Sequence, residues 1–205
     1  MNSVTLASYM TNDTDPKSRY TSVYKGIRCS QTPRVLGALD ALAAATDDHP
    51  IKSVIEIGTL YGGFTQLLRD HDVSKCAQLF SFNVKKQCAL TIKNATLIIG
   101  DVFGSVHNQI IDLIKSQDRV ALFCDGGDKE REINEFSAFL KPKDLILCHD
   151  YVKDPSLVGK AETGYDWPCY ESLWANVKNS LEKNNCTPFL ETEMQLAMWG
   201  CFIKN

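Results

Sequence analysis

Short apolar runs alternate with amphipathic stretches along most of this chain. Runs of four to six residues rich in β-branched and aromatic side chains predict strands at 53–57, 78–82, 95–99, 120–124 and 144–148. Apolar residues at helical spacing predict helices at 32–46, 64–69, 106–115, 130–140 and 167–183. Thr32 is expected to be the N-cap of the first helix and Pro33 its first residue. The end, 189–203, is expected to form two strands joined near 193–195.

Alternating strands and helices in units of roughly 25 residues indicate an α/β fold with a parallel sheet covered on both faces. No repeat or long linker divides the chain, so residues 1–205 are expected to form one domain. Residues 1–22 are a polar N-terminal lead, which is expected to be loosely ordered.

A glycine-rich turn follows the first predicted strand and has the form Glu56-x-Gly58-x-x-x-Gly62. Glycines allow unusual backbone angles and close approach of a ligand, and the following helix start offers free N–H groups. A dinucleotide fingerprint needs glycine where Leu60 stands, and the P-loop pattern is absent from the sequence. The turn therefore favours a ligand with ribose and adenine but no phosphate, such as S-adenosylmethionine.

Polar residues stand at or just past the ends of five predicted strands: Glu56, Asn83, Asp101, Asp125 and Asp150. The carboxyl ends of parallel strands meet at one edge of a sheet, so these residues predict a single site. Asn83 either binds the ribose hydroxyls or forms a turn. Asp101 either accepts from an exocyclic amine such as adenine N6 or caps a helix.

Asp125 and Asp150 are the residues most suited to chemistry. Their strands are expected to be neighbours about 4.8 Å apart, so the two carboxylates would converge and repel each other. A Mg²⁺ ion would remove that repulsion. His149 either faces the crevice as a metal ligand or general base, or lies hydrogen-bonded below the site, because successive strand residues point to opposite faces.

Two segments resemble a known family. Cys124-Asp125-Gly126-Gly127-Asp128, Leu140-Lys141-Pro142 and His149-Asp150-Tyr151 resemble the D-G-G-x, L-x-P and H-D-Y block of small class I methyltransferases, of the cephalosporin-hydroxylase and macrocin O-methyltransferase types. Tyr24-Lys25-Gly26 and Gln31-Thr32-Pro33 resemble the lead-in of that group. The similarity runs from about Tyr24 to Tyr151, and the sequence departs from the pattern at Asn83, at Lys143-Asp144 and at His149.

The resemblance implies a Rossmann-like, seven-stranded, mostly parallel sheet with helices on both faces and an antiparallel C-terminal strand. It implies that S-adenosylmethionine is bound by Gln31, Glu56, Gly58, Thr59, Tyr61, Gly62, Asn83, Asp101, Val102 and Asp125. It also implies a catalytic site, with an optional Mg²⁺ ion, at Asp125, His149 and Asp150.

The expected reaction is methyl transfer to a hydroxyl of a small molecule, either a sugar or an aromatic compound or polyol. A non-catalytic cofactor-binding module of the same fold and an NAD-dependent oxidoreductase are the alternatives. The aromatic stretch 165–170, with Trp174, either lines the acceptor pocket or belongs to the core.

The composition limits the kinds of partner and the cellular location that can be expected for this protein. The net charge of −3 and the scattered basic residues speak against a nucleic-acid partner, and no apolar stretch is long enough for a membrane span. The polar N-terminus does not resemble a secretory signal, and the eight cysteines include no C-x-x-C pair. We therefore expect a reduced, cytoplasmic protein, with the option of a homo-oligomer.

Overall fold

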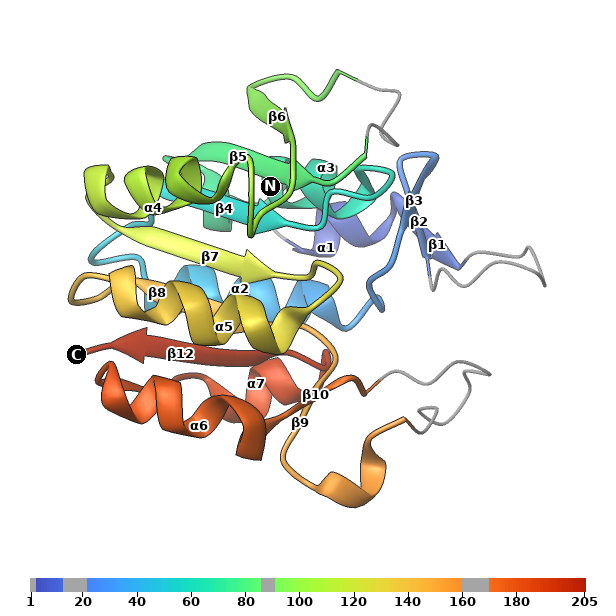
Figure 1. Ribbon diagram of the computed structural model, residues 1–205. Coiled ribbons are helices and arrows are strands. Elements are labelled where there is room, and N and C mark those ends of the chain that lie inside the picture. Colours follow the sequence, from blue (N-terminus) through green and yellow to red (C-terminus); the bar gives the residue numbers. More distant parts are fainter. Residues whose placement is uncertain (1–2, 13–21, 86–90, 160–169) are drawn as a thin grey trace.

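A seven-stranded sheet forms the centre of the computed structural model, which describes residues 3–12, 22–85, 91–159 and 170–205 (Figure 1). The strand order is β11-β12-β8-β7-β4-β5-β6. The strands are β4 (Ser53–Ile57), β5 (Gln78–Asn83), β6 (Ala95–Ile99), β7 (Val120–Cys124), β8 (Leu145–Cys148), β11 (Cys186–Pro188) and β12 (Gly200–Lys204). Strands β4 to β8 are parallel, whereas β12 is antiparallel to β8 and to β11. The predicted mostly parallel sheet with an antiparallel C-terminal strand is confirmed.

Helices cover both faces of this sheet (Figure 1). The helices are α1 (Ser3–Ala7), α2 (Val35–Ala45), α3 (Gly63–Asp70), α4 (His107–Ser116), α5 (Lys129–Phe136), α6 (Trp174–Lys183) and α7 (Glu191–Gln195). Alternate strand residues enter two cores: Val54 and Phe123 pack with α1, α2, α3 and α7, whereas Ile55 and Leu122 pack with α4, α5 and α6. Burial on both faces explains why these strands are continuous apolar runs.

The topology creates a crevice between β4 and β7. Strand β4 pairs with β5 on one side and with β7 on the other. The chain therefore leaves β4 in one direction, through β5 and β6, and later returns to continue in the other direction through β7 and β8. Ligands of open α/β sheets bind at such a switch point, outside the carboxyl ends of the strands.

Both ends of the chain differ from the prediction. Residues 3–12 are not a loose lead: α1 packs on α2 with Leu6 fully buried, and β1 (Met10–Asn12) forms a small antiparallel sheet with β2 (Ser22–Tyr24) and β3 (Ile27–Cys29). The C-terminal strand pair is present, but it begins before residue 189, and α7 occupies the predicted join. Helix α7 forms there because Met194 packs into the core while its glutamates face solvent.

Two helix starts also differ. The backbone turns at Thr32, whose carbonyl accepts the N–H of Val35 at 3.0 Å, but Arg34 is the N-cap of α2. The hydroxyl of Thr32 has no hydrogen-bond partner among the described residues, so the predicted side-chain cap is not made. Helix α6 begins at Trp174, after a two-residue strand β10 (Ser172–Leu173) that pairs with β9 (Tyr151–Val152). The predicted helix residues 167–169 lie outside the described residues.

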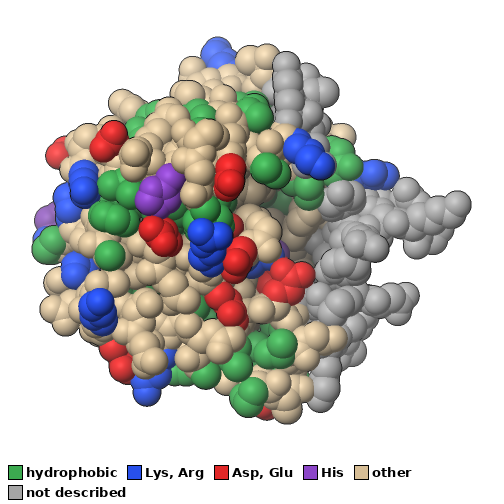
Figure 2. Space-filling model, in the orientation of Figure 1, with side chains coloured by type: hydrophobic (Ala, Val, Ile, Leu, Met, Phe, Trp, Pro, Cys, Tyr) green, Lys and Arg blue, Asp and Glu red, His purple; other side chains and the backbone are tan. Residues whose placement is uncertain are grey.

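Surface features agree with the composition. On the face shown in Figure 2, basic and acidic side chains are interspersed rather than gathered into a patch of one sign. Within the described ranges, no helix is both long and apolar enough to cross a membrane. Short 3₁₀ turns lie at Asp72–Ser74, Ser137–Phe139 and Pro155–Leu157.

Candidate functional site

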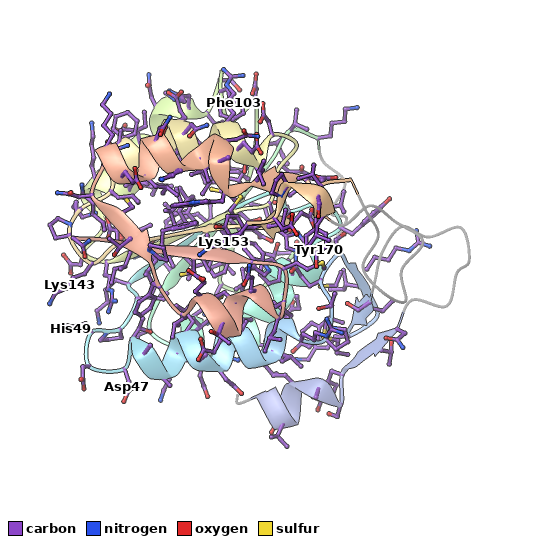
Figure 3. The ribbon with its side chains drawn as sticks, turned by 90° about the horizontal axis from the view of Figure 1, so that it is seen from below. Asp47, His49, Phe103, Lys143, Lys153 and Tyr170 are labelled. Atoms are coloured by element: carbon purple, nitrogen blue, oxygen red, sulfur yellow. The ribbon has the colours of Figure 1, made fainter. Side chains whose placement is uncertain are left out.

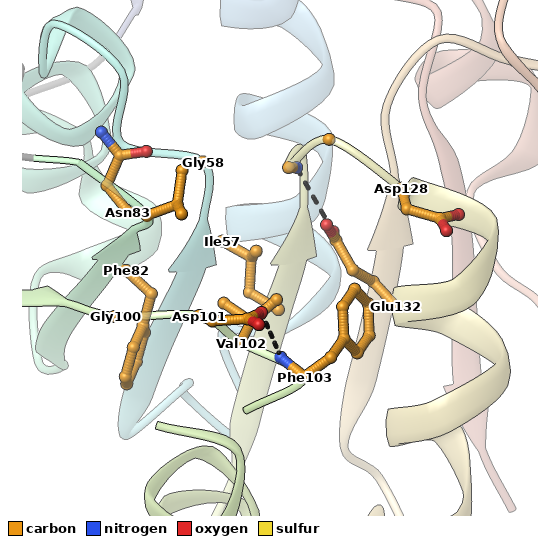
Figure 4. Close-up of a pocket in the computed structure, with 13 residues that line it drawn as sticks. Ile57, Gly58, Phe82, Asn83, Gly100, Asp101, Val102, Phe103, Asp128 and Glu132 are labelled. Carbon is orange, nitrogen blue, oxygen red and sulfur yellow. Dashed lines mark hydrogen bonds between the residues drawn. The ribbon is translucent and has the colours of Figure 1, made fainter. Parts of the chain in front are cut away.

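A cavity of about 230 Å³ opens at the carboxyl ends of β4, β5, β6 and β7 (Figure 4). Its walls are apolar, from Ile57, Phe82, Val102 and Phe103. Sites that enclose a whole small-molecule ligand usually measure roughly 300–1,000 Å³, so this cavity suits one ring system of a larger ligand. The other end of the sheet, where His49 and Lys143 lie, is remote from this edge (Figure 3).

Four of the predicted cofactor residues line this cavity: Gly58, Asn83, Asp101 and Val102. Asn83 also donates its side-chain N–H to the carbonyl of Lys85 at 2.8 Å, and Asp101 accepts the N–H of Phe103 at 3.0 Å. Asn83 thus forms the turn of its second alternative, whereas Asp101 does not cap α4, whose N-cap is Val106. Contact of either side chain with a ligand stays a prediction. Each side chain stabilises its own turn and still borders the space where a ligand would lie.

The glycine turn has a role that the sequence analysis did not foresee. Gly58 has a φ of +103°, and a Cβ added there would lie 2.0 Å from the carbonyl oxygen of Asp125. Gly62 has a φ of 91° and is the N-cap of α3. A Cβ on Gly63 would lie 2.2 Å from the carbonyl oxygen of Arg28. These glycines are required first of all by close approach of other parts of the backbone.

The remaining predicted residues of the turn point elsewhere. Thr59 shares a 2.5 Å hydrogen bond with Ser81 and is nearly buried. Of the residues in this turn, Thr59, Leu60, Tyr61 and Gly62 do not line the cavity. Leu60 and Tyr61 therefore do not block the cavity, and contact of Thr59, Tyr61 and Gly62 with a cofactor stays a prediction.

Glu56 lies beneath the turn and is fully buried. Its Oε2 atom accepts hydrogen bonds from Thr65 and Ser81, both at 2.5 Å, whereas Oε1 has no partner among the described residues. Burial raises the pKa of Glu56 to about 7, although the two hydroxyls oppose this rise. Glu56 thus supports the turn from below, and its predicted contact with the cofactor remains untested.

Asp125, His149 and Asp150 converge as predicted, with one ligand atom of each within 4.8 Å of the others. Asp150 follows β8 with a φ of 53°, so the strand has ended and consecutive side chains no longer point to opposite faces. The Nδ1 atom of His149 is 2.8 Å from Oδ1 of Asp125 and 3.6 Å from Oδ1 of Asp150. The left-handed backbone conformation of Asp150 is what brings the three side chains together.

His149 forms the lower side of this cluster. It is 3% exposed, its ring centroid is 4.7 Å from that of Trp199, and its Nε2 atom is buried without a partner in the described part of the chain. Burial lowers the pKa of His149, but Asp125 and Asp150 outweigh burial and raise the pKa above the ordinary value. Its position below the site, bonded to Asp125, matches the second alternative of the sequence analysis.

Gln31 holds Asp125 from the other side. Its Nε2 donates to Oδ2 of Asp125 at 2.9 Å, and its Oε1 accepts the indole N–H of Trp199 at 2.9 Å. Gln31 is fully buried and does not line the cavity. It is therefore placed to orient Asp125, and its predicted contact with the cofactor stays a prediction.

Lys129 was missed by the sequence analysis. Its Nζ lies 3.1 Å from Oδ2 of Asp150, 3.9 Å from Oδ1 of Asp125 and 2.7 Å from Oε2 of Glu171. Burial alone would lower the pKa of Lys129, but these three carboxylates raise it above the ordinary value. One signal was available in the sequence: a lysine at the start of a helix opposes the helix dipole, which indicates nearby carboxylates.

Asp150 takes up a proton more readily than an ordinary aspartate does. Its side chain is 15% exposed. Burial raises the pKa of Asp150, although His149 and Lys129 oppose the rise. A carboxylate with a raised pKa is a stronger base, so Asp150 is suited to accept the proton of a bound hydroxyl.

The donors at this cluster, two carboxylates and an imidazole, are of types that bind divalent cations. The ammonium of Lys129, however, already lies between the same carboxylates. Two unit charges about 4 Å apart interact by about 4 kcal/mol near a protein surface, so the ammonium alone would oppose a divalent ion by about 8 kcal/mol, against the attraction of the carboxylates. With Lys129 in this position, the residues do not fit a Mg²⁺ ion.

No family model matches this sequence, and no curated protein matches it. Solved structures do. The chain is similar to an apo structure of CmcI, with 12% identity and a TM-score of 0.63 over 95% of this chain and 80% of that one. It is similar to CmcI with Mg and SAM, with 14% identity and a TM-score of 0.61 over 95% of this chain and 81% of that one.

A third similar structure is the MycE methyltransferase from the mycinamycin biosynthetic pathway, in complex with Mg, SAH and mycinamycin VI. The identity is 14% and the TM-score 0.51, over 78% of this chain and 46% of MycE. At these identities the likeness concerns the fold. The fold implied by the resemblance is confirmed: this chain has the Rossmann-like fold of the class I methyltransferases.

Proposed function

We propose that this protein is an S-adenosylmethionine-dependent methyltransferase that acts on a hydroxyl group of a small molecule. The observation that carries the proposal is the adjacency of two sites at one sheet edge. The cavity stands over the ends of β4, β5 and β6, and the Asp125–Asp150 cluster stands at the ends of β7 and β8. The backbone of Gly58, which lines the cavity, is in contact with that of Asp125, so the two sites adjoin.

The cavity is suited to the adenosine part of the cofactor. Its apolar walls would enclose the adenine ring, with Asp101 near the exocyclic amine and Asn83 near the ribose. S-adenosylmethionine would supply a methyl group on a sulfonium, which is already a good leaving group. CmcI and MycE have been solved with SAM or SAH, and the proposal extends that ligand to this chain.

The protein's own contribution would be alignment and deprotonation. Asp150 would accept the proton of the acceptor hydroxyl. Burial raises its pKa, and its side chain is still partly exposed, so a substrate can reach it. Asp125, oriented by Gln31 and His149, would hold the same hydroxyl in line with the methyl group. His149, with its Nε2 buried, acts here by positioning Asp125.

The acceptor is proposed to be a sugar, an aromatic hydroxyl compound or a polyol. MycE was solved with the small molecule mycinamycin VI, which favours an acceptor of small-molecule size. Trp174 does not support the predicted aromatic wall, because it stacks on Phe202 with ring centroids 5.8 Å apart. Of the rest of the predicted aromatic stretch, 165–169 lies outside the described residues and Tyr170 is half-buried.

The test is to measure SAH binding by calorimetry and SAH formation with a panel of sugars, catechols and macrolide-like polyols. Asp150→Ala should lower turnover by about 10²- to 10⁴-fold and leave SAH affinity within a few fold. Asp112→Ala, on the exposed face of α4, is the matched control and should behave as wild type. Undiminished turnover in Asp150→Ala would contradict the role of Asp150.

The alternatives give different results in the same experiment. A non-catalytic module would bind SAH but methylate no member of the panel. An oxidoreductase would enhance NADH fluorescence and release no heat with SAH. Either outcome would overturn the proposal.

A further inference from the structure

The ammonium group of Lys129 lies inside the proposed acceptor site rather than on the surface. The side chain is 9% exposed, and its Nζ is within 4.0 Å of carboxylate oxygens from Asp125, Asp150 and Glu171. These carboxylates come from the ends of β7 and β8 and from the residue before β10. One cation therefore connects three separate segments of the sheet edge.

The position of Lys129 in the chain makes this contact unusual. Lys129 is the first residue of α5, where a positive charge opposes the helix dipole. The adjacent Asp128 caps the helix by accepting the N–H of Arg131, so Lys129 takes no part in capping it. The ammonium donates a hydrogen bond to Glu171 at 2.7 Å and forms ion pairs with Asp150 at 3.1 Å and with Asp125 at 3.9 Å.

We infer that the ammonium of Lys129 takes the place of a divalent cation between Asp125 and Asp150, so that the acceptor site works without a metal. The inference rests on the proposed function for the meaning of the site. It assigns Lys129 a positioning role: it keeps the two carboxylates together and charged, and leaves Asp150 able to accept a proton. The solved complexes of CmcI and MycE contain Mg, so the inference sets this chain apart from them.

The first test uses the wild-type protein. Mn²⁺ and Mg²⁺ are titrated by calorimetry into the protein alone and into its SAH complex, at the pH of the activity assay. We expect no saturable binding at millimolar concentrations and no change of SAH affinity. Saturable metal binding at the site, or SAH binding that tightens with Mg²⁺, would overturn the inference.

The second test changes the cation. Lys129→Met removes the charge and should create a divalent site, seen as new Mn²⁺ binding and as a rise in the thermal midpoint when MgCl₂ is added. Lys129→Arg keeps a positive charge, so like wild type it should show neither Mn²⁺ binding nor a rise in the thermal midpoint with MgCl₂. Lys153→Met is the matched control (Figure 3). It breaks a surface ion pair between Lys153 and Glu191, which at 2.7 Å is as short as the pair between Lys129 and Glu171.

These readouts separate the inference from the proposed function. Metal titration and thermal stability require neither an acceptor nor methyl transfer, so they decide the role of Lys129 even if no substrate is found. Should Lys129→Met fail to fold, wild type and Lys129→Arg still test the inference. Metal binding by Lys129→Arg equal to that of Lys129→Met would show that charge is not the cause, and would overturn it.

Discussion

Two acidic sites at neighbouring strand ends, Glu56 alone and the pair of Asp125 and Asp150, are stabilised in different ways. Glu56, on β4, is surrounded by hydroxyls, and burial raises its pKa to about 7. Asp125 and Asp150, beyond β7 and β8, share the ammonium of Lys129. Neutral donors leave a buried carboxyl close to protonation, whereas a cation keeps carboxylates charged. Glu56 is fully buried, whereas the side chain of Asp150 is 15% exposed, so only the second arrangement can take a proton from a substrate.

Removal of the cation should have the largest effect on stability. Lys129→Met removes the nearest positive neighbour of Asp150, at 3.1 Å, and leaves His149 at 3.6 Å. Breaking a largely buried pair by removing one member costs about 3–5 kcal/mol. Urea denaturation at neutral pH in EDTA measures this loss. Lys129→Arg should retain most of the stability, and a loss below about 1 kcal/mol in Lys129→Met would contradict the comparison.

The Glu56 side of the comparison predicts a pH dependence. The folded state raises this pKa from 4.5 to about 7, so the folded protein binds the proton more tightly than the unfolded chain. The resulting stabilisation is complete below pH 4.5 and is lost as the pH rises to about 7, amounting to about 3 kcal/mol.

Glu56→Gln should lack this part of the decline, as measured by urea denaturation at several pH values. Glu132, whose pKa burial raises to about 8, contributes a loss of the same sign in both proteins. The informative quantity is therefore the difference between wild type and Glu56→Gln at each pH. An identical decline in both proteins would show that Glu56 does not take up a proton on folding.

The smallest effect is expected in the cavity. Asn83→Ala should weaken SAH binding by about 5- to 10-fold, because one hydrogen bond contributes about 1 kcal/mol. Turnover at saturating cofactor should change little, in contrast to Asp150→Ala. Asn108→Ala, exposed on α4, is the calorimetric control. Unchanged affinity in Asn83→Ala would remove Asn83 from the cofactor site and leave only its turn.

Local patterns in the sequence predicted the parts of the fold that depend on burial of neighbouring residues. The inner strands β4, β7 and β8 were recognisable because residues buried on both faces form continuous apolar runs, as in Val120–Cys124. The convergence of Asp125 and Asp150 followed from parallel pairing of their strands. Helix α7 was missed because a five-residue helix is stabilised by its packing against the core rather than by its own pattern.

The tertiary structure alone decided how the site is held together. Gln31 reaches Asp125 across 94 residues of sequence, and Lys129 reaches Glu171 across 42. Asp150 joins His149 and Asp125 because it adopts a left-handed backbone conformation after β8. Contacts between distant segments depend on how the sheet and its loops pack, and a single sequence carries that information only through the complete fold.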